Sequence, residues 1–402
     1  MSRTLVVVGH GMVAHRLVER VLAGDTHRRW RVVVIGEEPW PAYDRIRLSG
    51  YLEGTSAADL LLPTPPPLAD GRVETWTGTR VVEVDRERRT VRTGHGERHT
   101  YDALVLATGS RPFVPPVPGR ELPGCFTYRT LDDVQAIQAA ATPGAAGVVV
   151  GGGLLGLEAA NGLRALGLRT HVVEMAPRLM PVQLDGPGGS LLADIVRGRG
   201  MDIRCGVSME RVAPGADGRV ASVALTDGTV LDASMVVFAA GVRPGDGLAA
   251  GAGLPTGPRG GFLVDEWCRT PDPRVWAVGE CAAVAGRCHG LVAPGYRTAE
   301  IVAAQLLRET PAPFRDPDLS TRLKLLGVQV ASFGDAQADT DGAMEYAVGA
   351  PRGGRYAKLV LSGDGRVLLG GVLVGDTEPY PRLKALVGHR LPASADDLLR
   401  HG

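Results

Sequence analysis

The stretch GVVVGGGLLGLEAANGLRALGLRTHVVE, residues 147–174, decides the fold of this chain. An apolar run is followed at once by a glycine turn, a helix rich in Leu and Ala, and a second apolar run that ends in Glu174. This order of strand, turn, helix, strand and acid is that of a dinucleotide-binding βαβ unit. Gly151 permits the tight turn, Gly153 lets the backbone approach a pyrophosphate, and Gly156 lets helix and strand pack closely. Glu174 is placed to accept both ribose hydroxyls of an adenosine and to repel a 2′-phosphate.

A second unit of the same kind opens the chain. Residues 4–8 are a predicted strand, and Gly9, Gly11 and Ala14 follow it in the order G-x-G-x-x-A, which the motif permits. An apolar helix comes next. Because the N-terminus of such a helix offers unpaired N–H groups and the positive end of a dipole, both turns are predicted to bind phosphates.

The acid of the first unit is less clearly placed. The next strand, residues 31–35, is followed by Glu37 and Glu38, and the spacing from the turn is long because of the insert GDTHRRW. We expect Glu37, the acid nearer to the strand end, to bind the ribose.

Two fingerprints in one chain indicate either duplicated NAD domains or an FAD site with an NAD(P) site. The segment YDALVLATGS runs a strand into Ala107, Thr108 and Gly109, and a later strand runs into Gly279 and Glu280. In this order, around an inserted second unit, an A-T-G turn and an A-x-G-E segment are the paired signature of flavoproteins related to disulfide reductases. The sequence therefore favours one FAD site and one NAD site.

The composition limits the classes of function. The 402 residues predict two or three domains. A formal net charge of zero argues against a nucleic acid or a membrane surface as the main partner. The sequence lacks a signal peptide and an apolar run of about 18 residues, so we expect a cytoplasmic protein. Five scattered cysteines without a CxxC pair indicate no disulfide framework, no zinc or other metal site, and no cysteine-ligated iron–sulfur cluster.

The complete order of motifs resembles the FAD/NAD-dependent pyridine nucleotide-disulfide oxidoreductase superfamily. Longer stretches are similar to one branch, the flavin-containing N-terminal half of the large subunit of NADH-dependent assimilatory nitrite reductases. They include GEEPWPAYDRIRLSGYL (36–52), VVEMAPRLMPVQLD (172–185) and STRLKLLGVQVASFGD (320–335). The resemblance covers essentially the whole chain.

The resemblance implies an α/β fold like that of glutathione reductase, with two Rossmann-like domains and a small α+β domain that forms an interface. The predicted boundaries are 1–118 with 236–315 for FAD, 119–235 for NAD, and 316–402 for the C-terminal domain. The nitrite reductase subunit continues into iron–sulfur and sirohaem segments, whereas this sequence has no cysteine after Cys288. We therefore expect the electron-input module alone, in a possible homodimer.

The resemblance also implies the site residues. The expected FAD ligands are Gly9, Gly11, Met12, Ala14, Glu37, Arg45, Val82, Ala107, Thr108, Gly109, Gly279 and Glu280. The expected NADH ligands are Gly151, Gly153, Leu154, Leu155, Gly156, Glu174 and Gly241. Glu158 matches an acid near the nicotinamide in relatives, and Arg45 is expected at the FAD phosphates or the flavin edge. An acid on a helix surface and a surface ion pair remain the alternatives for these two residues.

Two departures from the relatives limit what can be carried over. Gly50 stands where ferredoxin reductases usually carry a lysine, and no cysteine lies between residues 41 and 60, where peroxidase and oxidase relatives carry a redox thiol. Cys281 is the one thiol expected near the flavin, and a redox role for it stays open.

Three functions follow from this sequence. In the first, NADH passes a hydride to the flavin and the electrons leave to a separate iron–sulfur or haem protein. In the second, the flavin reduces a small acceptor directly, such as oxygen, a quinone, or a nitro or nitroso compound. In the third, the protein is a non-enzymatic flavoprotein whose NADH-dependent conformation controls association.

The choice of NADH over NADPH is predicted to depend on Glu174. Replacing Glu174 by Ala removes the carboxylate that would repel a 2′-phosphate, so the ratio of kcat/KM for NADH to that for NADPH should fall. Steady-state kinetics with both nucleotides measures this ratio, and an unchanged ratio would show that another residue decides it.

Overall fold

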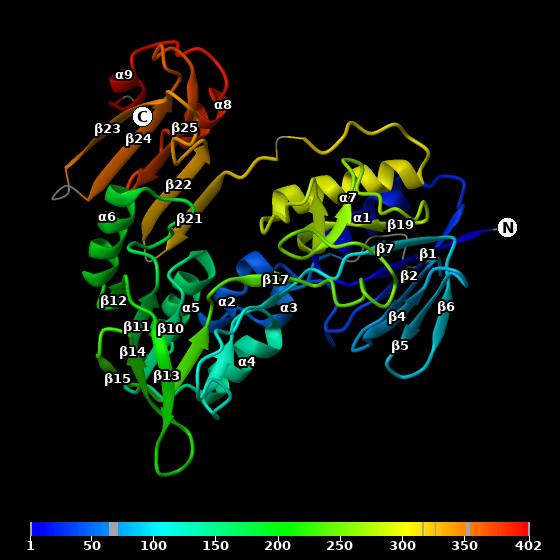
Figure 1. Cartoon of the computed structure of the whole chain (residues 1–402), viewed down its shortest axis with the longest axis horizontal. Helices are drawn as coiled ribbons and strands as arrows, with labels where there is room; N and C mark the ends of the chain where they lie inside the picture. Colours follow the sequence, from blue (N-terminus) through cyan, green and yellow to red (C-terminus); the bar gives the residue numbers. More distant parts are fainter. Residues whose placement is uncertain (1, 64–70, 316, 326, 351–353, 401–402) are drawn as a thin grey trace. The chain divides into compact units, whose positions relative to one another are not determined.

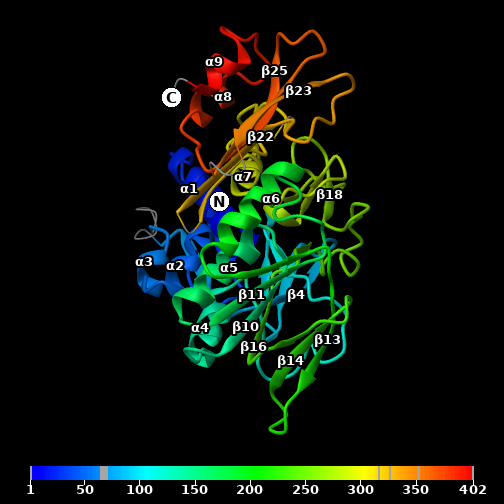
Figure 2. The same ribbon diagram turned by 90° about the vertical axis from the view of Figure 1, so that its left-hand side faces the viewer.

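The computed structural model describes residues 2–63, 71–315, 317–325, 327–350 and 354–400, which form two compact units (Figures 1 and 2). The first unit comprises Met1–Arg47, Ser56–Arg111 and Val242–Pro317, and the second comprises Leu48–Thr55, Pro112–Gly241 and Asp318–Gly402. The chain thus passes back and forth between the units. The finer division into three domains stays a prediction.

The first unit is organised around a five-stranded sheet in the order β19-β7-β1-β2-β3. Its pairs are parallel, with β1 at the centre between β2 and β7. The strands are β1 (Arg3–Val8), β2 (Trp30–Ile35), β3 (Val73–Trp76), β7 (Ala103–Leu106) and β19 (Val275–Ala277). Leu5, Val6 and Val7 have no exposed surface, as expected for a strand of a parallel sheet that is covered on both faces.

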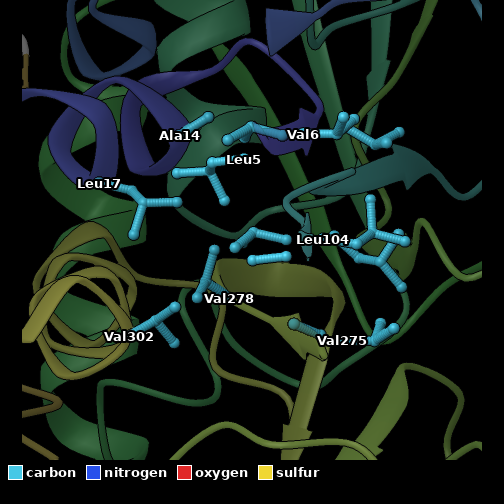
Figure 3. Close-up of a cluster of buried hydrophobic side chains, with 14 of the residues drawn as sticks. Leu5, Val6, Ala14, Leu17, Leu104, Val275, Val278 and Val302 are labelled. Carbon is cyan, nitrogen blue, oxygen red and sulfur yellow. The ribbon is translucent and has the colours of Figure 1, made fainter. Parts of the chain in front are cut away.

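Two helices, α1 (Met12–Gly24) and α7 (Val292–Leu306), pack on this sheet and against each other. Figure 3 shows Leu17 of α1 and Val302 of α7 gathered with Leu5 and Leu104 of the strands. The helical repeat brings Leu17, Val21 and their apolar neighbours to one buried face of α1. This packing fixes where the N-terminus of α1 lies relative to the end of β1.

Smaller elements complete the first unit. Strands β4 (Val81–Asp85), β5 (Thr90–Thr93) and β6 (Arg98–Thr100) form an antiparallel sheet. The remaining strands are β8 (Ser110–Pro112) with β17 (Val242–Pro244), and β18 (Phe262–Val264) with β20 (Ala282–Val284). Short helical turns are η1 (Arg45–Arg47), α3 (Ala57–Leu60) and η3 (Gly279–Cys281).

The second unit contains its own five-stranded parallel sheet, in the order β12-β11-β10-β16-β9. The strands are β9 (Cys125–Thr127), β10 (Ala146–Val150), β11 (Arg169–Glu174), β12 (Asp202–Cys205) and β16 (Met235–Phe238). The helices are α2 (Ser49–Leu52), α4 (Leu131–Ala140), α5 (Leu154–Ala165) and α6 (Gly186–Arg197), and Figure 2 shows α4 and α5 beside the sheet. Strands β13 (Met209–Pro214), β14 (Val220–Leu225) and β15 (Val230–Asp232) form an antiparallel sheet.

The C-terminal part of the second unit is a five-stranded antiparallel sheet in the order β21-β22-β25-β24-β23. Its elements are β21 (Thr321–Leu325), β22 (Val328–Gly334), β23 (Met344–Ala350), β24 (Arg355–Leu361), β25 (Leu368–Val374), α8 (Tyr380–Ala385) and α9 (Ala395–Arg400). The buried Lys358 of β24 ties this sheet to α6. Its Nζ lies 2.8 Å from Oε2 of Glu345 and 3.4 Å from Oδ2 of Asp185, the residue that caps the N-terminus of α6.

No helix in the described part of the chain is long and apolar enough to span a membrane. The α/β fold with two Rossmann-like sheets and a small C-terminal sheet confirms the predicted fold class.

Gly156 of α5 tests the packing at the second glycine turn. A methyl group there would lie 1.9 Å from the carbonyl oxygen of Gly151, which belongs to the backbone and cannot move aside. Gly156→Ala should therefore lower the free energy of unfolding by about 1–3 kcal/mol. Gly186→Ala is the matched control, because a methyl group at this first residue of α6 meets nothing within 4 Å. Urea unfolding followed by circular dichroism measures both variants, and equal stabilities would contradict the close contact.

Candidate cofactor sites

The glycine turn after β10 leaves the N-terminus of α5 open. Gly151 has a φ of +114°, and a methyl group there would lie 2.4 Å from the carbonyl oxygen of Ala239. Gly153 precedes the first residue of α5, and a methyl group there would meet nothing within 4 Å. No side chain caps this helix. The N–H groups of its first turn, which begins with Leu154 and Leu155, are therefore available to a phosphate.

The turn after β1 repeats this geometry in the first unit. Gly9 has a φ of +112°, and a methyl group there would lie 2.1 Å from the carbonyl oxygen of Ala107. Gly11 precedes α1, which has no side-chain cap, and the space beside Gly11 is again free within 4 Å. Met12 and Ala14, in the first turn of α1, are buried. The residues fit a bound pyrophosphate at each turn.

The A-T-G turn, residues 107–109, is hydrogen-bonded to Gly245, which directly follows β17. Thr108 Oγ1 donates a hydrogen bond to the carbonyl oxygen of Gly245 (2.5 Å). The N–H of Gly245 donates to the carbonyl oxygen of Gly109 (2.8 Å). Gly109 has a φ of +61°. In the second unit, Gly241 has a φ of +105°, and its carbonyl accepts from the N–H of Phe113 (2.9 Å).

Gly279 and Glu280 lie in η3, against the helices and β8 of the first unit. The N–H of Gly279 donates to Thr298 Oγ1 of α7 (3.0 Å), and Ser110 Oγ donates to Glu280 Oε2 (2.7 Å). Ser110 directly follows the A-T-G turn, a position from which its role could have been inferred. The structure thus brings the two halves of the flavoprotein signature together.

Cys281 is fully buried beside Glu280. Its Sγ donates to the carbonyl oxygens of Val278 (3.2 Å) and Leu106 (3.4 Å), and burial raises the pKa of the thiol. A thiol in this state is inert toward exchange, because the thiolate is the reactive form.

Arg45 forms an ion pair within the first unit. Its guanidinium contacts Glu38, and Nη1 donates to the hydroxyl of Tyr43 (2.8 Å), which in turn donates to Glu38 Oε2 (2.7 Å). Burial alone would lower the pKa of Arg45, but the charges of Tyr43 and Glu38 outweigh it and the pKa is raised. Arg45 therefore stays positively charged.

The two acids after β2 are in different surroundings. The side chain of Glu37 is 68% exposed, with Oε1 at 3.7 Å from Nε of Arg80, whereas Glu38 is engaged by Arg45 and Tyr43. Val82, on β4, is 43% exposed. The roles of Glu37 and Val82 in binding FAD stay predictions.

Glu174, at the end of β11, braces the second glycine turn. Its Oε2 accepts from the N–H of Gly152 and its Oε1 from the N–H of Ala176, both at 2.6 Å. The guanidinium of the nearby Arg178 donates to the carbonyl oxygens of Leu184 (2.8 Å) and Pro181 (3.4 Å). The carboxylate of Glu174 is therefore fixed at the turn, and the guanidinium of Arg178 is hydrogen-bonded to the loop 181–184.

Glu158 lies one turn into α5 and is partly buried. Burial raises the pKa of its carboxyl to about 7. The buried Tyr128, just before α4, lies near it: burial and the charge of Glu158 raise the pKa of the Tyr128 hydroxyl. Segment 48–55 packs against the same helix, where Asn161 Nδ2 donates to Glu53 Oε1 (2.5 Å). Glu158 is thus partly buried on α5, and its place near the nicotinamide stays a prediction.

These two turns, in two separate units, are those of an oxidoreductase that binds two dinucleotides. The chain belongs to the pyridine nucleotide-disulphide oxidoreductase family, whose model matches residues 3–305. Residues 320–391 match the C-terminal domain of rubredoxin NAD+ reductase. The protein is an FAD-dependent NAD(P)H oxidoreductase, with FAD and NAD(H) as its cofactors.

Two curated relatives and one solved structure are similar to the chain over almost its whole length. It is 47% identical to the nitrite reductase [NAD(P)H] large subunit of Klebsiella oxytoca, over 98% of this chain and 41% of the relative. It is 33% identical to the assimilatory nitrate reductase electron transfer subunit of Bacillus subtilis (strain 168), over 95% of this chain and 49% of the relative. The crystal structure of the covalent putidaredoxin reductase–putidaredoxin complex matches it with a TM-score of 0.86 and 26% identity, over 98% of this chain and 95% of that chain.

These findings confirm the resemblance to the flavin module of nitrite reductase large subunits. The chain spans less than half the length of the two curated relatives.

The raised pKa of Glu158 predicts a pH-dependent stability. The folded-state pKa of Glu158, about 7, lies above its unfolded value of about 4.5. The free energy of unfolding therefore falls as the pH rises from about 4.5 to about 7, because the folded protein holds the proton of Glu158 more tightly than the unfolded chain does. Glu158→Gln removes this loss and should raise the free energy of unfolding at pH 8 relative to that at pH 5 by about 1–3 kcal/mol. Urea unfolding at both pH values measures it, with Glu121→Gln (87% exposed) as control. A parallel pH dependence in wild type and Glu158→Gln would contradict the assignment.

Proposed function

We propose that this protein takes a hydride from NADH onto its FAD and passes the electrons to a separate redox protein. The observation that carries the proposal is the pair of uncapped helix N-termini, each beside a glycine with free space around it. Each offers backbone N–H donors to one pyrophosphate. Two adenine-bearing cofactors can therefore be held independently, one by each unit.

FAD would be held by the first unit. The N–H groups at Gly11 and the first turn of α1 would bind its pyrophosphate, and Thr108 and Glu280 would line the rest of the molecule, positioned by Gly245 and Ser110. Arg45, held positive by Glu38, would stabilise negative charge near the phosphates or the flavin edge. When bound, FAD would supply the two-electron chemistry with the nicotinamide, because no side chain of the protein can accept a hydride.

NADH would be held by the second unit. The N–H groups at Gly153 and the first turn of α5 would bind the pyrophosphate, and Glu174 would accept the ribose hydroxyls while its carboxylate repels a 2′-phosphate. The guanidinium of Arg178 is bound to carbonyl oxygens of its own loop. Glu158 would hold or release a proton near the nicotinamide at neutral pH. These features support NADH as the preferred nucleotide.

The acceptor is proposed to be a separate iron–sulfur or haem protein. Support comes from two similar proteins, an electron transfer subunit and a reductase solved in complex with putidaredoxin. The buried, unreactive thiol of Cys281 also argues against a cysteine relay. A cytoplasmic location and a homodimer are part of the same proposal and depend only on the sequence.

Anaerobic titration of the purified holoprotein with NADH tests the first step. About one equivalent of NADH should bleach the absorbance of oxidised flavin, and NADPH should do so only at much higher concentration. Stopped-flow reoxidation with a [2Fe–2S] ferredoxin or a rubredoxin then tests the second step. We expect reoxidation by one of these carriers to be faster than by oxygen or a quinone. A flavin that NADH leaves oxidised would refute the function, and faster reoxidation by small acceptors would favour direct reduction of a small molecule.

A further inference from the structure

The loop between β11 and α6, residues 175–185, is held to the second glycine turn. The N–H of Met180 donates to the carbonyl oxygen of Gly152 (2.9 Å), and the N–H of Gly152 donates to Oε2 of Glu174 (2.6 Å). A methyl group on Gly152 would lie 2.6 Å from Cδ2 of Leu179, which has no exposed surface. The β11–α6 loop, the glycine turn and the acid are therefore held together, and a displacement of the loop would also displace the turn.

This loop begins where NADH is proposed to bind. It directly follows Glu174, the predicted ribose ligand, and the N–H of Ala176 donates to Oε1 of that acid (2.6 Å). Met175 is 76% exposed, whereas Met180 and Leu184 have no exposed surface. The loop thus has buried residues that fix it within the second unit and an accessible residue beside the ribose ligand. Because the loop continues directly from the acid, its position affects the adenosine end of the NADH site.

The far end of the loop is bound by the C-terminal sheet. Asp185, the N-cap of α6, accepts a hydrogen bond at Oδ2 from the hydroxyl of Tyr356 (2.6 Å) and lies 3.4 Å from Nζ of Lys358. The carbonyl oxygen of Val182 accepts from Nε2 of Gln337 (3.2 Å), a residue that follows β22. Two separate points of the β11–α6 loop are thus attached to a sheet whose own sequence carries no nucleotide motif.

The attachment leaves little freedom between the sheet and the loop. A methyl group on Gly188, in the first turn of α6, would lie 3.3 Å from Cγ1 of Val372 and 3.4 Å from Cδ1 of Tyr356, so the helix lies directly against β24 and β25. Burial and the bond to Asp185 raise the pKa of the Tyr356 hydroxyl, which therefore stays a donor. Lys358 is buried on the same strand, and its ammonium needs the carboxylate of Asp185 as a counter-charge. The two strands therefore fix the place of Asp185.

We propose that Tyr356 and Lys358 are positioning residues for the NADH site. Through Asp185 they fix the end of the β11–α6 loop, and the loop in turn fixes the glycine turn and Glu174. This inference rests on the NADH site proposed above and adds to it a part for the C-terminal sheet. The affinity for NADH then depends on that sheet, whereas FAD, held by the first unit, is bound without it.

Anaerobic stopped-flow reduction of the FAD-loaded protein tests the proposal. The rate constant of flavin reduction is measured against NADH concentration, which gives a Kd for NADH and a limiting rate constant. Tyr356→Phe removes the hydroxyl that binds Asp185, so the Kd should rise roughly 2–10-fold, the range for one hydrogen bond, while the limiting rate constant stays that of the wild type. Lys358→Met removes a charged partner of Asp185 and should raise the Kd at least as much.

Tyr346→Phe is the matched control. It removes a hydroxyl from the neighbouring strand β23 of the same sheet, where Tyr346 donates to Oδ1 of Asp396 (3.1 Å). Its Kd for NADH should equal that of the wild type. The FAD content, measured as flavin absorbance per protein, should be the same in the wild type and all three variants.

Three results would count against the proposal or its basis. A wild-type Kd in Tyr356→Phe, or in a folded Lys358→Met, would overturn it, because the contacts would then only attach the sheet; Tyr356→Phe decides the question even where Lys358→Met does not fold. A Kd raised equally in Tyr356→Phe and Tyr346→Phe would overturn it too, because any loosening of the sheet would then have the same effect. A wild-type flavin that NADH does not reduce would overturn the proposed function itself, so the two failures are distinguishable.

Discussion

The structure depends on two places where backbone lies directly against backbone. At Gly9 and Gly151, the chain leaves a buried strand with a positive φ and passes so close to the carbonyl of Ala107 or Ala239 that no side chain fits between them. This contact joins each glycine turn to a neighbouring parallel strand. The helix that follows each turn has a glycine, Gly11 or Gly153, as its N-cap, so no side chain occupies the N–H groups of its first turn, and a dinucleotide can bind them.

Burial then decides which side chains near these turns carry charge. The carboxyl of Glu158 is shifted toward its neutral form, and the thiol of Cys281 is kept protonated. Arg45 is the opposite case, because the charges of Tyr43 and Glu38 outweigh the effect of burial and raise its pKa. The result is a positively charged Arg45 in the first unit, a proton-holding acid on α5, and an unreactive thiol. This pattern suits a cofactor that performs the chemistry while the protein orients it.

Ion pairs also connect the C-terminal sheet to the nucleotide-binding part of the second unit. Lys358 is 2% exposed and pairs with Glu345 and Asp185, and the hydroxyl of Tyr356 donates to Asp185 (2.6 Å). Asp185 also accepts from the N–H of Gly188 in the first turn of α6. Removing both acids would leave the buried ammonium of Lys358 without a counter-charge, which is strongly unfavourable. The sheet therefore has a defined attachment to α6, although its own sequence carries no nucleotide motif.

The sequence by itself determined the two βαβ units, the cofactors and the family, because these depend on local patterns: apolar strands, glycines at fixed offsets, and the acid Glu174 at a strand end. Only the tertiary structure decided what lies beside those patterns. It placed segment 48–55 against α5 in the second unit and bound the guanidinium of Arg178 to carbonyl oxygens of its own loop. The physical reason is that hydrogen bonding and burial depend on neighbours distant in sequence.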